Sequence, residues 1–246
     1  MMSKKNKIYF ASDFHLGSPN HQESLTREKK ICLWLDSIKN DAKEIYLVGD
    51  IFDFWFEYQS VIPKGFERLK GKLYELTDDG IKIHFFPGNH DLWTFGYLAK
   101  ELGLIIHKKP LITEINGKKF YIAHGDGLGK GDLKYKLIKG IFNNPFCQYL
   151  FSIIHPRIGI WIAKAWSRKS RMKGGFNKSK FVQKQLINHS KEVLKNQNIN
   201  YFIYGHIHEP IEIELNQSCK YINIGDWITH FSFLELDESN LLIKYF

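Results

Sequence analysis

Short apolar runs that are typical of strands alternate with helical stretches through the first third of the chain. The runs KIYFAS (7–12), EIYLVG (44–49) and KIHFFPG (82–88) have the pattern of buried strands. Between them the pattern predicts an amphipathic helix over 23–40 and a second helix near 64–79. This order of strands and helices indicates a layered α/β sheet.

The pattern changes twice in the rest of the chain. Two alternating runs flank Asn116-Gly117, and Asn-Gly is the dipeptide most typical of a tight hairpin. Residues 130–196 then lack strand alternation, which predicts several helices. A strand pattern returns at 201–205. Four short β runs follow it, at 211–215, 220–224, 230–236 and 241–245.

The order of these elements predicts two facing mixed sheets flanked by helices. We expect the sheets to be formed by a core of residues 1–129 and 197–246. The helical stretch, residues 130–196, is expected to be an insert that lies over the ends of the strands. A chain of 246 residues is long enough to bury the core that this arrangement needs.

Positive charge is concentrated in the predicted insert. The formal net charge is +9, yet residues 133–191 alone hold 13 Lys and Arg and no Asp or Glu. Nucleic acid, an anionic membrane surface and a phosphorylated substrate all fit such a segment, as does a solvated basic surface. No 18-residue apolar stretch, signal peptide or cysteine pairing pattern is present, so we expect a cytoplasmic protein.

Side chains that can bind metal stand where predicted strands give way to loops. They lie in the blocks SDFHLG, GDIFDFW, GNHD, HGD and GHIH, and each block follows an apolar run. The candidate ligands are Asp13, His15, Asp50, Asn89, His124, His206 and His208. Each block alone is more often structural, but their joint occurrence in this order predicts a metal centre.

The types and spacing of these residues favour two divalent cations. Residues two apart at a strand end reach the same side, which suits the pairs Asp13/His15 and His206/His208. Asp50 is the natural bridge, because a carboxylate can share its oxygens between two ions. A nitrogen and oxygen ligand set without thiolate suits Mn²⁺ first, with Fe or Zn²⁺ as alternatives.

The series DxH, GDxxD, GNHD, HGD and GHxH resembles the calcineurin-like metallophosphoesterase superfamily. The resemblance implies a four-layer α/β/β/α sandwich and a metal-dependent hydrolase. It also implies that His90 protonates the leaving group or steadies the phosphoryl charge, with Asp91 orienting its imidazole. One ion is expected on Asp13, His15, Asp50 and His208, and the other on Asp50, Asn89, His124 and His206.

Within that superfamily the chain is most similar to the UDP-2,3-diacylglucosamine pyrophosphatases of lipid A biosynthesis. The similarity lies in GDIFDFW, HGDGLGKGDLKY, GHIHEP and the position of the insert. It implies cleavage of a lipid-linked nucleotide to UMP and 2,3-diacylglucosamine 1-phosphate. His90 departs from the best-known branch of that family, where arginine follows the metal-binding asparagine, so another lipid or nucleotide diphosphate remains an alternative substrate.

The insert suits such a ligand. Residues 141–166 are mostly apolar or aromatic, and the basic run SRKSRMKGGFNKSK follows at 167–180. We expect the apolar part to hold acyl chains or to contact the cytoplasmic face of the inner membrane. A helical hairpin that simply packs on the core is the alternative. The expected substrate contacts are Asn89, Asp132, Tyr135, Arg168, Ser170, Arg171 and Lys178.

Two other functions compete with this hypothesis. A nuclease or cyclic-nucleotide phosphodiesterase could use the basic insert to follow a phosphate backbone, but the apolar bulk of the insert argues against a nucleic-acid partner. A non-catalytic scaffold protein should have lost ligands, whereas all seven are present here. The sequence does not determine the oligomeric state.

Overall fold

The structure is a computed structural model of the 246-residue chain. It describes residues 5–131, 133–173, 176–238 and 240–246. Side chains at 164, 166, 168–173 and 176–178 are likewise outside the description. Among the helices that it describes, none combines the length and the apolar character needed to cross a membrane.

Six strands form the first sheet, in the order β11-β10-β1-β2-β3-β4. Strands β1 to β4 are parallel, and β10 pairs antiparallel with β1. The bounds are β1 Lys7–Ala11, β2 Ala42–Val48, β3 Lys82–Phe86, β4 Ile105–Ile106, β10 Ser232–Asp237 and β11 Asn240–Tyr245. The carboxyl ends of β1, β2 and β3 therefore meet at one edge, where the first three predicted ligand blocks begin.

Five strands form the second sheet, in the order β5-β6-β7-β9-β8. Strands β5 and β6 form the hairpin predicted at Asn116-Gly117, and β7 is parallel to both β6 and β9. The bounds are β5 Leu111–Ile115, β6 Lys118–Ala123, β7 Tyr201–Tyr204, β8 Ile211–Asn216 and β9 Cys219–Asn223. The HGD and GHIH blocks follow β6 and β7, so they too lie at neighbouring carboxyl ends.

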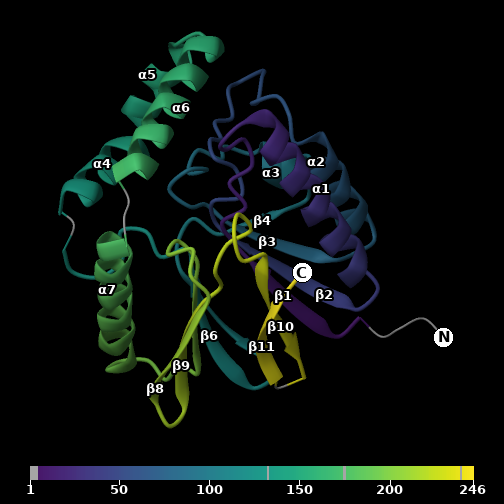
Figure 1. Cartoon of the computed structure of the whole chain (residues 1–246), viewed down its shortest axis with the longest axis vertical. Coiled ribbons are helices and arrows are strands. Elements are labelled where there is room, and N and C mark those ends of the chain that lie inside the picture. The colour runs from purple at the N-terminus through teal and green to yellow at the C-terminus, as the bar shows by residue number, and fades with distance from the viewer. Residues whose placement is uncertain (1–4, 132, 174–175, 239) are drawn as a thin grey trace.

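Helices cover the outer face of each sheet (Figure 1). Helices α1 (His21–Ile38) and α2 (Glu67–Asp78) pack on the first sheet through residues that include Trp34 and Leu73. Helix α7 (Phe176–Leu194) packs on the second sheet through Leu186, which is fully buried. This amphipathic packing gives each helix its stability.

Aromatic and aliphatic side chains fill the space between the two sheets. Phe10 and Tyr46 from the first sheet pack with Phe120 and Ile203 from the second. The rings of Phe10 and Tyr46 stack at 4.8 Å between centroids. The expected four-layer α/β/β/α sandwich is thus confirmed. Packing in its interior fixes the position of one sheet relative to the other.

The described part of the predicted insert forms four helices. Three of them, α4 (Leu133–Asn143), α5 (Pro145–Ile153) and α6 (Pro156–Lys173), group together on the same side of the molecule as α7 (Figure 1). Helix α7 lies within the predicted insert range but supplies the outer layer of the second sheet. The helical nature of the range agrees with expectation, while its division from the core stays a prediction.

Two short elements were not predicted from the sequence, namely α3 (Tyr97–Lys100) and strand β4. Neither is long enough to show a periodicity. The carboxylate of Glu57 accepts hydrogen bonds from the backbone amides of residues 95–98, at the start of α3, and holds this segment against the loop that follows β2.

Candidate metal centre

Hydrogen bonds donated by backbone amides join the loops that leave the two sheets. The amide of Asp13 donates to the carbonyl of Gly49 at 3.0 Å, and the amide of His15 donates to that of Asp50 at 2.9 Å. Across the sandwich, the amide of His206 donates to Oδ2 of Asp13 at 2.9 Å. Blocks that are up to 193 residues apart in sequence therefore form one site.

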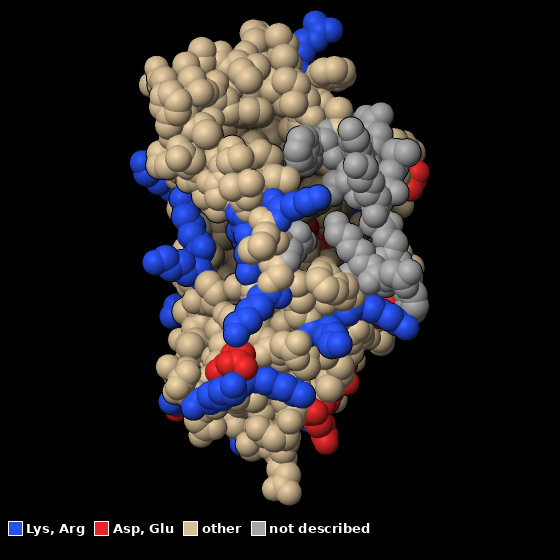
Figure 2. Space-filling model, turned by 90° about the vertical axis from the view of Figure 1, so that its left-hand side faces the viewer, with Lys and Arg blue, Asp and Glu red and all other residues tan. Residues whose placement is uncertain are grey.

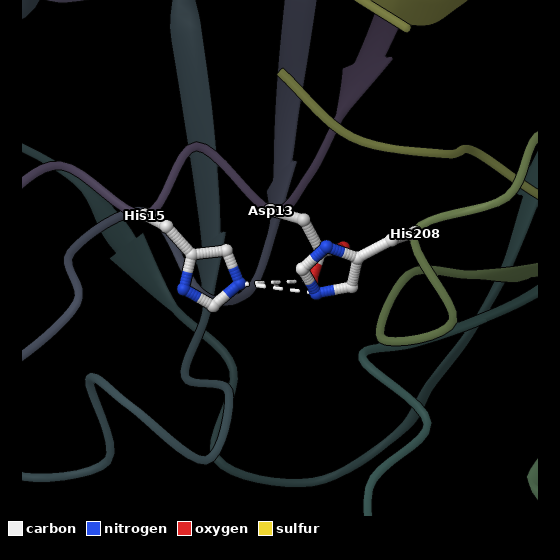
Figure 3. Close-up of side chains that lie close together, drawn as sticks. All are labelled: Asp13, His15 and His208. Atoms are coloured by element: carbon white, nitrogen blue, oxygen red, sulfur yellow. Dashed lines mark hydrogen bonds and ion pairs between the residues drawn. The ribbon is translucent and has the colours of Figure 1, made fainter. Parts of the chain in front are cut away.

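Asp13, His15 and His208 form a first cluster (Figure 3). Their side chains point toward one another, those of Asp13 and His15 from the loop after β1 and that of His208 from the loop after β7. Nε2 of His15 lies 3.2 Å from Nε2 of His208, and Oδ1 of Asp13 lies 3.4 Å from the latter atom. Ligand atoms that each lie about 2.1 Å from one ion are separated by roughly 3–3.5 Å. The spacing therefore suits a cation.

Asp50, His124 and His206 form a second cluster. Oδ2 of Asp50 lies 3.3 Å from Nε2 of His124, and the same oxygen lies 3.6 Å from Nε2 of His15 in the first cluster. Asp50 thus faces both clusters, as a bridging ligand would.

Asn89 lies beside this second cluster. The amide of the next residue, His90, donates to Oδ1 of Asp50 at 2.9 Å. Oδ1 of Asn89 and Oδ1 of Asp13 are buried and have no hydrogen-bond partner within the described part of the chain. Buried acceptors of this kind are costly unless something occupies them, and a cation would do so.

Five of the seven predicted ligands have backbone angles in the left-handed region. The φ angles are 55° at Asp13, 44° at His15, 54° at Asp50, 71° at His206 and 67° at His208. Each such conformation costs roughly 1–3 kcal/mol for a residue other than glycine, and it persists where function requires it. The strain is concentrated at the site, which supports a functional role.

Close packing explains two of the glycines that precede ligands. A Cβ added to Gly88 would lie 2.6 Å from the amide nitrogen of Asp50. At Gly49 it would come within 2.5 Å of Cγ of His124, and the φ of 85° adds strain for any other residue. The ligand loops therefore approach each other more closely than a methyl group allows.

Burial and opposite charges set the protonation of the cluster. Burial alone would raise the pKa of Asp50, but His124, His90 and His15 outweigh it and hold the pKa well below its usual range. Burial lowers the pKa of His124, but attraction to Asp50 dominates and raises it to about 10. A divalent cation placed between these groups would replace the imidazole proton.

The pKa of His206 moves the other way. Burial and then repulsion by His124 lower it to about 4. A neutral imidazole has a free lone pair and is ready to bind a metal ion.

Groups around the clusters fix the orientation of the histidine rings. Nδ1 of His208 lies 3.3 Å from Oδ2 of Asp226, and Nδ1 of His124 lies 2.9 Å from the carbonyl oxygen of Val48. Carboxylates and carbonyls commonly hold metal-ligating histidines in this way. Asp226 was not among the site residues predicted from the sequence.

Asp91 is hydrogen-bonded to the backbone of the loops that carry the predicted ligands. Its carboxylate accepts from the backbone amides of Gly88, Asp50, Ile51 and Phe52 and contacts no imidazole in the described structure. Asp91 therefore fixes the ligand loops, because its oxygens are already taken by these amides.

Asp53 and Ser167 contact the His90 ring instead. Nδ1 of His90 lies 3.0 Å from the carbonyl oxygen of Asp53 and 3.1 Å from Oγ of Ser167. Neither residue was selected from the sequence as part of the site.

The expected substrate contacts from the insert are only partly described. The hydroxyl of Tyr135 donates to Oδ2 of Asp126 at 2.5 Å, and Nζ of Lys139 lies 2.6 Å from the same oxygen. This ties α4 to the HGD loop. The other expected contacts fall on side chains outside the described residues, namely Asp132, Arg168, Ser170, Arg171 and Lys178.

Comparison with known proteins places the chain in a family. A dimetal phosphatase from Danio rerio aligns with a TM-score of 0.44 and 12% identity, covering 98% of this chain and 96% of that one. The UDP-2,3-diacylglucosamine hydrolase of Porphyromonas gingivalis is 37% identical, covering 98% of this chain and 97% of the relative. That of Actinobacillus succinogenes is 26% identical, with 97% and 99% covered. The family model for calcineurin-like phosphoesterases matches residues 6–210. The chain is therefore a metal-dependent hydrolase that belongs to the calcineurin-like phosphoesterase family.

Proposed function

We propose that the protein hydrolyses the pyrophosphate of UDP-2,3-diacylglucosamine to UMP and 2,3-diacylglucosamine 1-phosphate, as a step of lipid A biosynthesis. The observation that carries this proposal is the two-cluster His/Asp site in a chain that is 37% identical, over 98% of its length, to a UDP-2,3-diacylglucosamine hydrolase. The similarity spans both the core and the insert, so it includes the part of the chain expected to meet the substrate.

Two divalent cations, which we expect to be Mn²⁺, would occupy the clusters. Asp13, His15, Asp50 and His208 would hold one, and Asp50, Asn89, His124 and His206 the other. The buried acceptors on Asp13 and Asn89 and the 3.2–3.6 Å donor spacings support this assignment. Such a pair of ions activates water near neutral pH and stabilises negative charge on phosphate oxygens.

His90 would act on the leaving group. The carbonyl oxygen of Asp53 can only accept a hydrogen bond, so the Nδ1 atom that faces it at 3.0 Å carries a proton. Nε2 of His90 is then the atom that would donate a proton to the departing phosphate oxygen, in the state in which both ring nitrogens carry a proton. The ring also packs edge-on against the His15 ring at 4.8 Å between centroids, which fixes it beside the first cluster.

Polar groups of the loops and the insert would bind the substrate. Arg168, Ser170, Arg171 and Lys178 would contact its phosphates, and Asn89, Asp132 and Tyr135 would contribute further substrate contacts. The hydroxyl of Tyr135 is donated to Asp126 in the structure, so donation to the substrate requires it to exchange partners. The absence of acidic residues between 133 and 191 favours an anionic ligand there.

The outer surface of α4 to α6 would contact the acyl chains or the membrane. Phe146, Tyr149, Ile153 and Trp161 are each more than 60% exposed, which is unusual for so many large apolar side chains on neighbouring helices. In Figure 2, which shows this side of the molecule, the described residues of the upper part are almost all uncharged, and Lys and Arg lie across the middle. Apolar side chains beside basic ones are typical of peripheral membrane binding, here at the cytoplasmic face of the inner membrane.

Substrate competition tests the proposal. Protein loaded with Mn²⁺ should cleave UDP-2,3-diacylglucosamine in preference to bis-p-nitrophenyl phosphate and to DNA. In ¹⁸O-labelled water the label should appear in UMP. Preference for DNA would replace the proposal by a nuclease, and label found only in the sugar phosphate would overturn the proposed position of attack.

A further inference from the structure

We propose that Ser167, on helix α6 of the insert, is a positioning residue for His90. The inference rests on the proposed function, because it gives His90 a part in the reaction. It goes further by assigning the insert a role in forming the reactive centre itself, in addition to holding substrate.

The hydroxyl of Ser167 lies between two groups of the core. Its Oγ is 3.2 Å from each carboxylate oxygen of Asp53 and 3.1 Å from Nδ1 of His90. Because a carboxylate only accepts, the hydroxyl proton goes to Asp53, and the lone pairs of Oγ face the Nδ1–H group of His90. Ser167 can therefore donate to one group and accept from the other at the same time.

This arrangement also reaches the first metal cluster. Oδ1 of Asp53 lies 3.5 Å from Nδ1 of His15, whose Nε2 atom faces Asp13 and His208. The Ser167 hydroxyl thus contacts the carboxylate of Asp53, which lies beside the predicted metal ligand His15. It also contacts the imidazole of His90, the predicted proton donor. Ser167 is only 5% exposed, so water has little access to compete for these contacts.

The group His15, Asp53 and His90 could by its spacing also hold a cation. Two of its members already have a hydrogen-bond partner in Ser167, and the Nδ1–H of His90 faces a carbonyl oxygen. A cation would have to displace those hydrogen bonds. The geometry therefore favours a positioning network over a third ion site.

The insert is attached to the same loops that carry Asp53 and His90. Phe151 of α5 packs against Phe56 and Trp93, each at 4.9 Å between ring centroids. Nε1 of Trp93 donates to the carbonyl of Phe142 at the end of α4, at 2.8 Å. Trp93 follows His90 by three residues, so a movement of the insert on this aromatic contact would move Ser167 relative to the His90 ring.

The substitution Ser167→Ala tests the proposal, with Ser152→Ala as the matched control. Ser152 is an exposed serine of α5, and among the residues that the structure describes its hydroxyl bonds only to the carbonyl of Tyr149 in its own helix. Loss of a residue that orients active-site groups typically costs about 10–100-fold. We expect kcat of Ser167→Ala to fall by that factor with KM and bound Mn²⁺ unchanged, while Ser167→Thr, which keeps the hydroxyl, restores most of kcat.

A second readout needs neither metal nor substrate. In the EDTA-treated protein, the imidazole Nδ1–H proton of His90 should give a protected NMR signal, identified by its loss in His90→Gln. In Ser167→Ala this proton should exchange with water about tenfold faster, which corresponds to the loss of one hydrogen bond. Ser152→Ala should leave the exchange rate unchanged.

These readouts separate the possible failures. If kcat and the His90 proton exchange of Ser167→Ala both match wild type, or if only KM rises, the positioning role is wrong. Faster exchange in Ser167→Ala would support the role even if wild-type protein cleaved no UDP-2,3-diacylglucosamine, and in that case the proposed substrate alone would be wrong.

Discussion

Replacing Asp50 by asparagine should weaken cation binding while keeping the shape of the side chain. Oδ2 of Asp50 lies 3.3 Å from Nε2 of His124 and 3.6 Å from Nε2 of His15, and Oδ1 accepts the amide of His90 at 2.9 Å. The amide oxygen of asparagine can keep the last contact. It offers no anionic oxygen to two cations, so we expect a folded protein that binds divalent cations poorly.

The expected effect can be stated as a shift in melting temperature. At an Mn²⁺ concentration of 100 Kd, wild type gains about 2.7 kcal/mol of stability, a rise in Tm of roughly 5–11 °C for a chain of this size. Loss of a residue that hydrogen-bonds to a metal ligand weakens metal binding about 10–100-fold. Loss of a bridging ligand should therefore weaken Mn²⁺ binding at least about 100-fold. The same Mn²⁺ concentration then equals about one Kd of the variant. The variant therefore gains about 0.4 kcal/mol of stability, a rise in Tm of roughly 1–2 °C.

Thermal unfolding of EDTA-treated protein, titrated with MnCl₂, measures this difference. Glu44→Gln is the control, because Glu44 also pairs with a histidine (Nε2 of His84, 3.4 Å) but lies near the start of β2, away from the ligand loops. It should keep the full Mn²⁺-dependent shift. If Asp50→Asn shows the same shift as wild type, Asp50 does not hold the cations.

Three further outcomes follow from the geometry. His90→Ala should keep its bound Mn²⁺, measured by mass spectrometry, but lose about 100-fold in kcat, as for a missing general acid; unchanged kcat would remove His90 from the reaction. Gly88→Ala should lose the Mn²⁺-dependent shift, because the added Cβ would lie 2.6 Å from the amide of Asp50; normal Mn²⁺ binding would show that the loop can yield. Glu44 has a pKa lowered from 4.5 to about 2, chiefly by its hydrogen bond with His84, so its stabilising effect is complete above pH 4.5 and is lost as the pH falls toward 2. Urea unfolding of Glu44→Gln should therefore depend less on pH in that window, and an unchanged dependence would contradict the pairing.

The clustering of the predicted ligands could be inferred from the sequence because strand geometry determines it. Asp13 and Asp50 each follow an apolar run, and the carboxyl ends of parallel strands meet at one edge of a sheet. Ser167 and Asp53 were not predictable, since they are 114 residues apart and no local pattern links a helix serine to a loop carboxylate. The contact between Asp226 and His208 is of the same kind, because it depends on how two loops of the second sheet turn.

The fold was predictable to a similar extent. Strand and helix periodicities gave the two sheets and the helical range 130–196. The packing of α7 on the second sheet could not be inferred, because an amphipathic pattern shows that a face is buried without showing what covers it. The hydrogen bonds of Asp91 could not be inferred for a related reason, since its oxygens accept from backbone amides that have no sequence signature.

Anomalous diffraction from crystals grown with Mn²⁺ would test the dinuclear centre most directly. We expect two peaks about 4 Å apart, one against His15 and His208 and the other against His124 and His206, with Asp50 between them. A single peak, or no peak among these side chains at saturating Mn²⁺, would contradict the two-metal centre on which the proposed hydrolysis depends.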